Sequence, residues 1–98
     1  HIASFNNQLY ADPDTNFSVY SNGWQDLDAN GRDTLASLEE NHGKLVAGLI
    51  GSLRVYGING LEKKLPVNLI DKGIIDHEGQ AWFVVKGFGL VRKGTSVE

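Results

Sequence analysis

Apolar residues recur at steps of three and four between Thr34 and Leu53. This spacing places them on one face of an α-helix, while Glu39, Glu40 and Lys44 fall mostly on the opposite face. Asn30 precedes the run and suits a helix N-cap. We therefore predict an amphipathic helix over about residues 31–53. Its apolar positions are Leu35, Leu38, Leu45, Val46, Leu49, Ile50 and Leu53.

Beyond this segment the apolar pattern changes to alternation, which is typical of strands. Residues 54–58 and 61–65 flank Asn59-Gly60, a dipeptide that suits a two-residue type I′ turn. Residues 74–75 and 81–85 predict a second hairpin with a loop of four or five residues, and residues 88–91 continue the sheet. The predicted fold class is α+β, with one helix followed by a small antiparallel sheet of hairpins.

The first 25 residues are rich in Asn, Asp and Ser with scattered aromatics. Phe17 to Tyr20 predict one short strand, and Asn22-Gly23 a turn. The same segment also fits an extended N-terminal arm on a neighbouring molecule. We predict a single domain over residues 1–98, because this length is usual for one domain, and we expect no internal repeat. The absence of Met indicates a fragment or a processed form.

Composition narrows the classes of protein. Hydrophobic residues make up 41% and charged residues 21%, as expected of a folded domain. The chain has no Cys, which excludes disulfides, thiolate zinc sites and a cysteine nucleophile. No apolar run approaches the roughly 18 residues of a membrane span. The net charge is −3, but it is unevenly distributed. Residues 1–53 carry two basic and seven acidic side chains, whereas residues 54–98 carry seven basic and five acidic ones.

Asp26, Asp28 and Asn30, followed by Gly31, match the first half of a calcium-binding loop, in which alternate oxygens ligate a hard cation. The twelfth position should be a bidentate Glu and is Ser37. A turn followed by a helix cap is the simpler interpretation of this candidate metal site. We therefore expect no metal and no cofactor.

No constellation of residues predicts catalysis. His42 and His77 lack a second ligand at metal spacing. Asp76, His77 and Glu78 are adjacent in a loop, point in different directions and have no paired nucleophile. Phosphate-binding and dinucleotide fingerprints are absent. We predict that the chain is not an enzyme.

The predicted helix also carries a heptad pattern over three repeats, formed by Leu35, Leu38, His42, Leu45, Leu49, Ser52 and Tyr56. A seam of this kind indicates self-association. The alternative is an amphipathic helix packed on its own sheet, which the wider stripe through Val46, Ile50 and Leu53 favours. The predicted oligomer interface consists of Leu38, His42, Leu45, Leu49 and Leu53.

Residues 44–58, KLVAGLIGSLRVYGI, resemble the short helical segment of bacteriophage fibre and head-fibre proteins. The matching positions are Leu45, Leu49, Leu53, Arg54, Gly57 and Ile58. The resemblance covers about 15 residues. It implies trimers with helices side by side, small β-modules after them, contacts with other structural proteins, and a place in the virion; without it, we expect a cytoplasmic protein.

The function predicted first is a non-enzymatic structural or interaction module, a homo-oligomeric fibre or decoration domain. The alternative is a nucleic-acid-binding module of winged-helix type, with the helix as recognition element and the second hairpin as wing. Its phosphate contacts would be Lys63, Lys64, Lys72, Lys86, Arg92 and Lys93. Lys44 is the single base of the predicted helix after Thr34, and together with the acidic overall charge this argues against nucleic acid as a partner.

Overall fold

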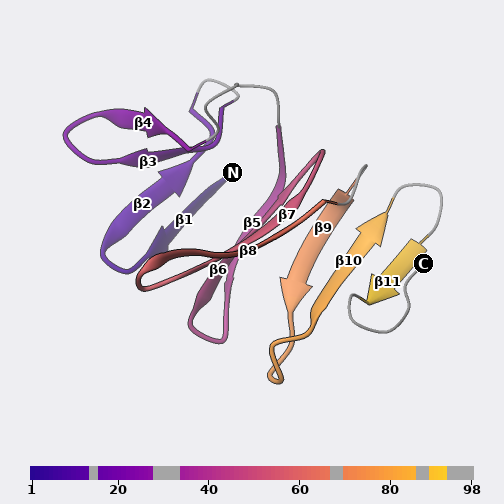
Figure 1. Ribbon diagram of the computed structural model, residues 1–98. Helices are drawn as coiled ribbons and strands as arrows, with labels where there is room; N and C mark the ends of the chain where they lie inside the picture. The colour runs from indigo at the N-terminus through magenta and orange to yellow at the C-terminus, as the bar shows by residue number, and fades with distance from the viewer. Residues whose placement is uncertain (14–15, 28–33, 67–69, 86–88, 93–98) are drawn as a thin grey trace.

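The computed structural model describes residues 1–13, 16–27, 34–66, 70–85 and 89–92, and there the chain forms eleven β-strands and no helix (Figure 1). The strands fall into three antiparallel sheets, each joined in chain order. Sheet A contains β1 (Ile2–Phe5), β2 (Gln8–Ala11), β3 (Ser18–Tyr20) and β4 (Trp24–Asp26). Sheet B contains β5 (Leu35–Asn41), β6 (Lys44–Leu49), β7 (Leu53–Gly57) and β8 (Gly60–Leu65). Sheet C contains β9 (Ile70–Ile75), β10 (Ala81–Val85) and β11 (Gly89–Arg92).

The α+β prediction, with its helix over residues 31–53, is wrong: the described part of that segment forms β5, β6 and the start of β7. A register shift between Leu35 and Ser37 puts Leu35 and Leu38, three residues apart, in the same core. Leu45 and Leu49 share that core because an even step keeps the same side of a strand. A bulge followed by even steps therefore produced spacings that imitate a helix.

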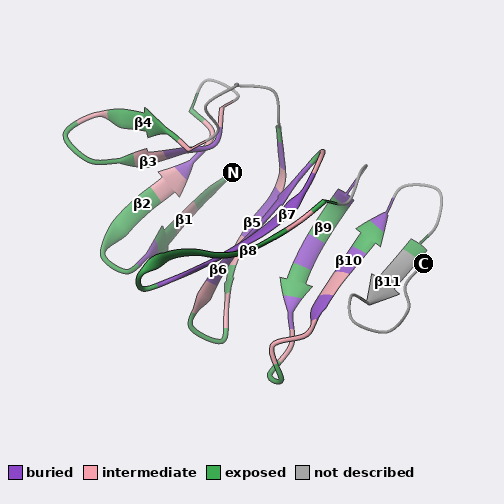
Figure 2. Ribbon diagram, viewed as in Figure 1, coloured by how far each residue is buried: buried purple, intermediate pink, exposed green. Residues whose placement is uncertain are grey.

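Sheet B is the middle layer of a face-to-face stack, and its two central strands, β6 and β7, are buried on both faces. One face packs on sheet A in the A–B core, whose buried residues are Phe5, Phe17, Leu35, Leu38, Leu45, Ala47, Leu49 and Tyr56. The other face packs on sheet C in the B–C core, formed by Val46, Leu53, Val55, Ile70, Ile75, Ala81, Phe83 and Val85. Figure 2 shows burial concentrated along β6 and β7.

The sheets approach one another through their first strands, since β1 contacts β5 and β9 contacts both β5 and β6. The Gly73 N–H of β9 donates to Ser37 Oγ of β5 at 3.1 Å, and the Ile75 N–H donates to Asn41 Oδ1 at 3.2 Å. Two side chains of β5 therefore satisfy backbone donors on the edge of sheet C, which would otherwise be open to pairing. A Cβ on Gly73 would collide with Leu53.

The hairpin predictions are largely confirmed. β7 and β8 form the first predicted hairpin, although Gly57 pairs with Gly60, so its turn is Ile58-Asn59 rather than Asn59-Gly60. β9 and β10 form the second, with Ile75 opposite Ala81. β3 and β11 lie where short strands were expected. Residues 1–25 form most of sheet A, which packs on sheet B.

Candidate functional site

Sheets A and B are built on one repeating unit of 36 residues. Phe5 pairs with Gln8 and Asn41 with Lys44, and 36 positions separate the members of one pair from those of the other. Leu9 pairs with Tyr20 and Leu45 with Tyr56, again 36 positions apart. The first two strands of each unit are joined by left-handed turns, Asn6-Asn7 and His42-Gly43.

Sheet C continues this unit with small shifts. Gly79 has a positive φ of 81° and follows Gly43, at 79°, by 36 positions. Strand β10 lies 36 positions after the residues 45–49 of β6. The pair formed by Val84 of β10 and Leu90 of β11 corresponds to the pair formed by Gly48 of β6 and Leu53 of β7. Val84 follows Gly48 by 36 positions, and Leu90 follows Leu53 by 37. The expectation of no internal repeat is therefore corrected, because the repeat lies in turn geometry and strand register more than in residue identity.

The outward face of sheet A exposes apolar side chains whose counterparts in sheet B are buried. Tyr20 is 50% exposed and its counterpart Tyr56 is 8% exposed. Leu9 is 37% exposed and its counterpart Leu45 is fully buried at 0%, and Ile2 is 66% exposed whereas its counterpart Leu38 is 8% exposed. We call Ile2, Leu9, Tyr20 and Trp24 the sheet A end face, since Trp24 pairs with Tyr20 on the same side of the sheet and is also exposed. No sheet formed by the described residues covers it in the way that sheet A covers sheet B.

The outward face of sheet C is the opposite end of the stack. It carries Lys72 and Ile74 from β9 and Trp82 and Val84 from β10, which we call the sheet C end face. Ile74 and Val84 are exposed and Trp82 is half-buried. These four residues, with Phe83, line a shallow depression of about 120 Å³. Both ends of the stack therefore present apolar surface.

An aromatic cluster shows how such faces pack inside the stack. Tyr56 of sheet B lies edge-on to Phe17 of sheet A, with ring centroids 5.8 Å apart and an interplanar angle of 71°. The ring centroid of Tyr10 lies 6.4 Å from that of Tyr56. Burial, followed by the electrostatic influence of Tyr56, raises the pKa of Tyr10 above its usual range. Burial between the sheets therefore favours the neutral phenol.

Asp76 organises the loop between β9 and β10. Its Oδ2 accepts the Trp82 indole N–H at 2.8 Å, and its Oδ1 accepts the Glu78 and Gln80 amides at 2.9 and 3.0 Å. The Trp82 hydrogen bond, followed by the two amides, lowers the pKa of the Asp76 carboxyl. This carboxylate therefore holds Trp82 in place on the sheet C end face and has a structural role.

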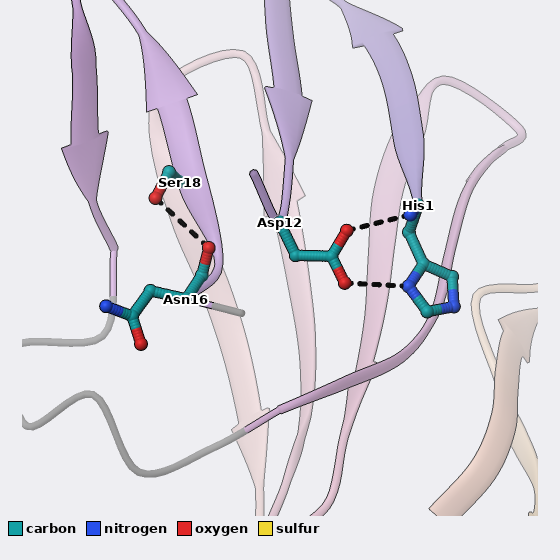
Figure 3. A network of polar contacts seen from close by, with 4 residues as sticks. All are labelled: His1, Asp12, Asn16 and Ser18. Atoms are coloured by element: carbon teal, nitrogen blue, oxygen red, sulfur yellow. Dashed lines mark hydrogen bonds and ion pairs between the residues drawn. The ribbon is translucent and has the colours of Figure 1, made fainter. Parts of the chain in front are cut away.

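Figure 3 shows a polar network at one end of sheet A. The His1 amino group and its Nδ1 lie 2.7 and 2.9 Å from the two Asp12 carboxylate oxygens. Ser18 Oγ donates to the Asn16 carbonyl at 3.1 Å and lies 3.2 Å from Asp26 Oδ1. Of the candidate calcium ligands, only Asp26 is described, since Asp28 and Asn30 lie outside the described residues. Among those residues, no three His, Cys, Asp or Glu side chains form a metal-binding group.

The residues predicted to form an oligomer interface are dispersed. Leu38, Leu45 and Leu49 lie in the A–B core, and Leu53 lies in the B–C core. His42 is exposed in the β5–β6 turn, with a φ of 51°. They share no helix face, so a helical seam does not exist in the described chain, and the four leucines are covered within the monomer.

The basic residues of the nucleic-acid alternative do not converge where they are described. Lys63 and Lys64 are exposed neighbours on β8, on opposite sides of the strand. Lys72 Nζ lies 3.0 Å from Glu39 Oε1 of β5. Arg92 lies on β11 with its side chain undescribed, and Lys86 and Lys93 lie outside the described residues. The described chain also lacks the recognition helix that a winged-helix module needs.

Sequence reasoning missed the two end faces and the buried Arg54, whose Nη1 donates to the Leu27 carbonyl at 3.3 Å. Comparing Val19-Tyr20 with Val55-Tyr56, 36 positions apart, could have revealed the repeat. No helix in the described residues is long and apolar enough to cross a membrane. No protein-family model, curated protein or solved structure matches the chain.

Proposed function

We propose that the chain is a non-enzymatic structural module that acts by joining its stacked sheets to further sheets of the same kind. The observation that carries this proposal is the contrast between matched positions. Ile2, Leu9 and Tyr20 are exposed where Leu38, Leu45 and Tyr56 are buried. Exposed apolar patches rimmed by polar residues mark sites of association.

The architecture supports the blade type of assembly. Antiparallel four-stranded sheets repeated radially around a central channel are the blades of β-propellers, which typically have four to eight of them. Here the first strands β1, β5 and β9 lie on the side where the sheets approach one another. Each sheet is a meander joined in chain order, with four strands in sheets A and B and three described strands in sheet C. Sheets A, B and C are three successive blades in this proposal.

The test is a measurement of mass by light scattering over a hundredfold range of concentration, combined with thermal melting. Association predicts a mass above 10.7 kDa and a melting temperature that rises with concentration. Tyr20→Lys should weaken association, whereas Ile58→Lys should not, because Ile58 is 75% exposed in a hairpin turn away from the end faces. A constant mass of 10.7 kDa with concentration-independent melting contradicts the proposal.

A place in a virion, which the resemblance to phage fibre proteins implies, stays a prediction. The helix through which that resemblance explained trimers is not formed by the described residues. Self-association therefore rests on sheet faces and not on a helical seam.

A further inference from the structure

We propose that the sheet A end face of one copy packs on the sheet C end face of a second copy, head to tail, and that two copies close one ring. This inference rests on the proposed function, since it requires association, and it adds the polarity, the contact residues and the number of copies. The partner is a second copy of this chain.

The polarity follows from the two interfaces inside the stack, which repeat in the same direction. Leu45 and Ala47 of sheet B face sheet A. Their counterparts 36 positions on, Ala81 and Phe83 of sheet C, face sheet B. Each sheet therefore uses the same side of its second strand to contact the sheet before it.

The two end faces are the unused halves of this repeating interface. In sheet A, the positions equivalent to Leu45 and Ala47 are Leu9 and Ala11, and they lie on the outward face. In sheet C, Trp82 is equivalent to Val46, which packs towards the following sheet. The sheet A end face corresponds to the side of a sheet that contacts the preceding sheet. The sheet C end face corresponds to the side that contacts the following sheet. The two end faces therefore complement each other, and neither complements itself.

The equivalences place individual side chains across the new interface. Tyr56 packs on Tyr10 of the preceding sheet. The residue of sheet C that is equivalent to Tyr10 is Trp82, because positions 10, 46 and 82 are separated by 36 residues each. Tyr20 of one copy therefore packs on Trp82 of the other. Leu38 packs in the core to which Ala3 and Tyr10 contribute. Ala3 and Tyr10 are paired across β1 and β2, and the equivalent pair across β9 and β10 is Ile74 and Trp82. Ile2, the counterpart of Leu38, therefore fills the depression beside Trp82.

Ring closure sets the number of copies. The described residues of this 98-residue chain form three sheets, fewer than the four to eight blades of closed propellers, and two copies of it supply six. A ring of two copies also buries both end faces of each copy, which leaves no apolar end open. Its second contact forms within the same complex, so it benefits from a high effective concentration.

Complementary variants test the polarity directly. The A-face variant combines Leu9→Lys with Tyr20→Lys, the C-face variant combines Ile74→Lys with Val84→Lys, and Ile58→Lys is the control. Head-to-tail packing predicts a mass of twice 10.7 kDa for the unmodified protein and the control, and 10.7 kDa for each variant alone. A one-to-one mixture of the two variants should recover a complex of twice that mass at the upper end of the concentration range, because each retains the face that the other lacks and one of the two contacts of the ring can form. Circular dichroism verifies folding, and single Tyr20→Lys and Val84→Lys variants replace a double variant that does not fold.

Each alternative outcome is distinct. An unmodified protein that stays at 10.7 kDa overturns both the proposed function and this inference. If one variant alone still dimerises, its intact face pairs with itself, which overturns the polarity while association stands. A mixture that forms no complex at any concentration overturns the head-to-tail polarity. A mass of the unmodified protein that grows steadily with concentration overturns the two-copy ring. As a second readout, Trp24→Phe keeps an aromatic ring beside Tyr20 and leaves Trp82 as the remaining tryptophan, and dilution should shift its emission to the red as the ring dissociates.

Discussion

The Asp76 carboxylate holds the β9–β10 loop together, because it accepts the Trp82 indole and two backbone amides. These bonds lower its pKa in the folded protein, with the Trp82 bond as the largest cause. A lowered pKa contributes stability above the unfolded value, about 3.9 for Asp, and that contribution disappears as pH falls through the folded value.

Asp76→Asn should therefore lower the melting temperature most above about pH 5, and the difference from the unmodified protein should shrink below about pH 4. Melting curves at matched pH values measure this difference. Glu78→Gln is the control, because only its backbone amide contacts Asp76. A difference that is constant from pH 3 to 7 would show that the charge of Asp76 contributes nothing.

Gly43 illustrates the cost of the turns that define the repeat. Its φ is 79°, and no atom lies within 4 Å of where a Cβ would be. Conformation and not space therefore sets the penalty. Gly43→Ala should destabilise the fold by about 1–2 kcal/mol, and Gly43→Asn by less, because Asn visits this region more readily. Asn7 already occupies the equivalent position at 62°. Chemical denaturation measures both variants, and equal costs for Ala and Asn would contradict the explanation.

At the scale of elements, strand β6 shows why the sequence predicted hairpins but not the central sheet. Turn dipeptides and alternating strands are local signals, so the β7–β8 and β9–β10 hairpins could be predicted. In β6, Leu45, Ala47 and Leu49 face one sheet while Val46 faces another, so the alternation of apolar and polar residues is lost. Only the presence of two neighbouring sheets distinguishes this pattern from a buried helix.

The exposed end face of sheet A could not be predicted from the sequence. Ile2, Leu9 and Tyr20 are ordinary apolar residues of short strands, and sequence alone does not indicate that they are exposed. Their significance comes from the comparison with Leu38, Leu45 and Tyr56, which needs the strand register of both sheets. Residue identity is retained at few of these positions, so the repeat was not apparent before the turns were aligned.

The junction between β5 and β9 makes a prediction at this scale. Ser37 Oγ accepts the buried Gly73 N–H. Ser37→Ala should cost about 1–3 kcal/mol, because it leaves a backbone donor without a partner away from water. Ser4→Ala, on an exposed position of β1, is the matched control and should cost little. Urea denaturation compares the two, and equal stability of both variants would show that the bond does not join sheets B and C.

The packing of Gly73 against Leu53 gives a second prediction for the same junction. Gly73→Ala places a methyl group where Leu53 lies, and overpacking of this kind typically costs about 1–3 kcal/mol. Leu53→Ala alone should cost about 2–5 kcal/mol through lost burial. The double variant should be more stable than the two costs predict together, because the smaller side chain makes room for the methyl group. Additive costs in a double-mutant cycle would contradict direct contact.

The described residues form a stack in which the middle sheet, sheet B, packs against a neighbouring sheet on each face, whereas sheets A and C each have one such neighbour. Stability in stacked repeats is approximately a sum of unit and interface terms, so an end sheet with one interface should open at a lower free energy than the middle sheet. Amides of β6 and β7 should therefore exchange most slowly with deuterium in dilute protein.

Association covers the end faces, so raising the protein concentration should slow exchange in β2, β3 and β10 while changing exchange in β6 little. The Leu9→Lys/Tyr20→Lys variant should lose this concentration dependence. Exchange that is uniform across the three sheets, or that slows equally in β6, would mean that the end sheets open only with the whole molecule.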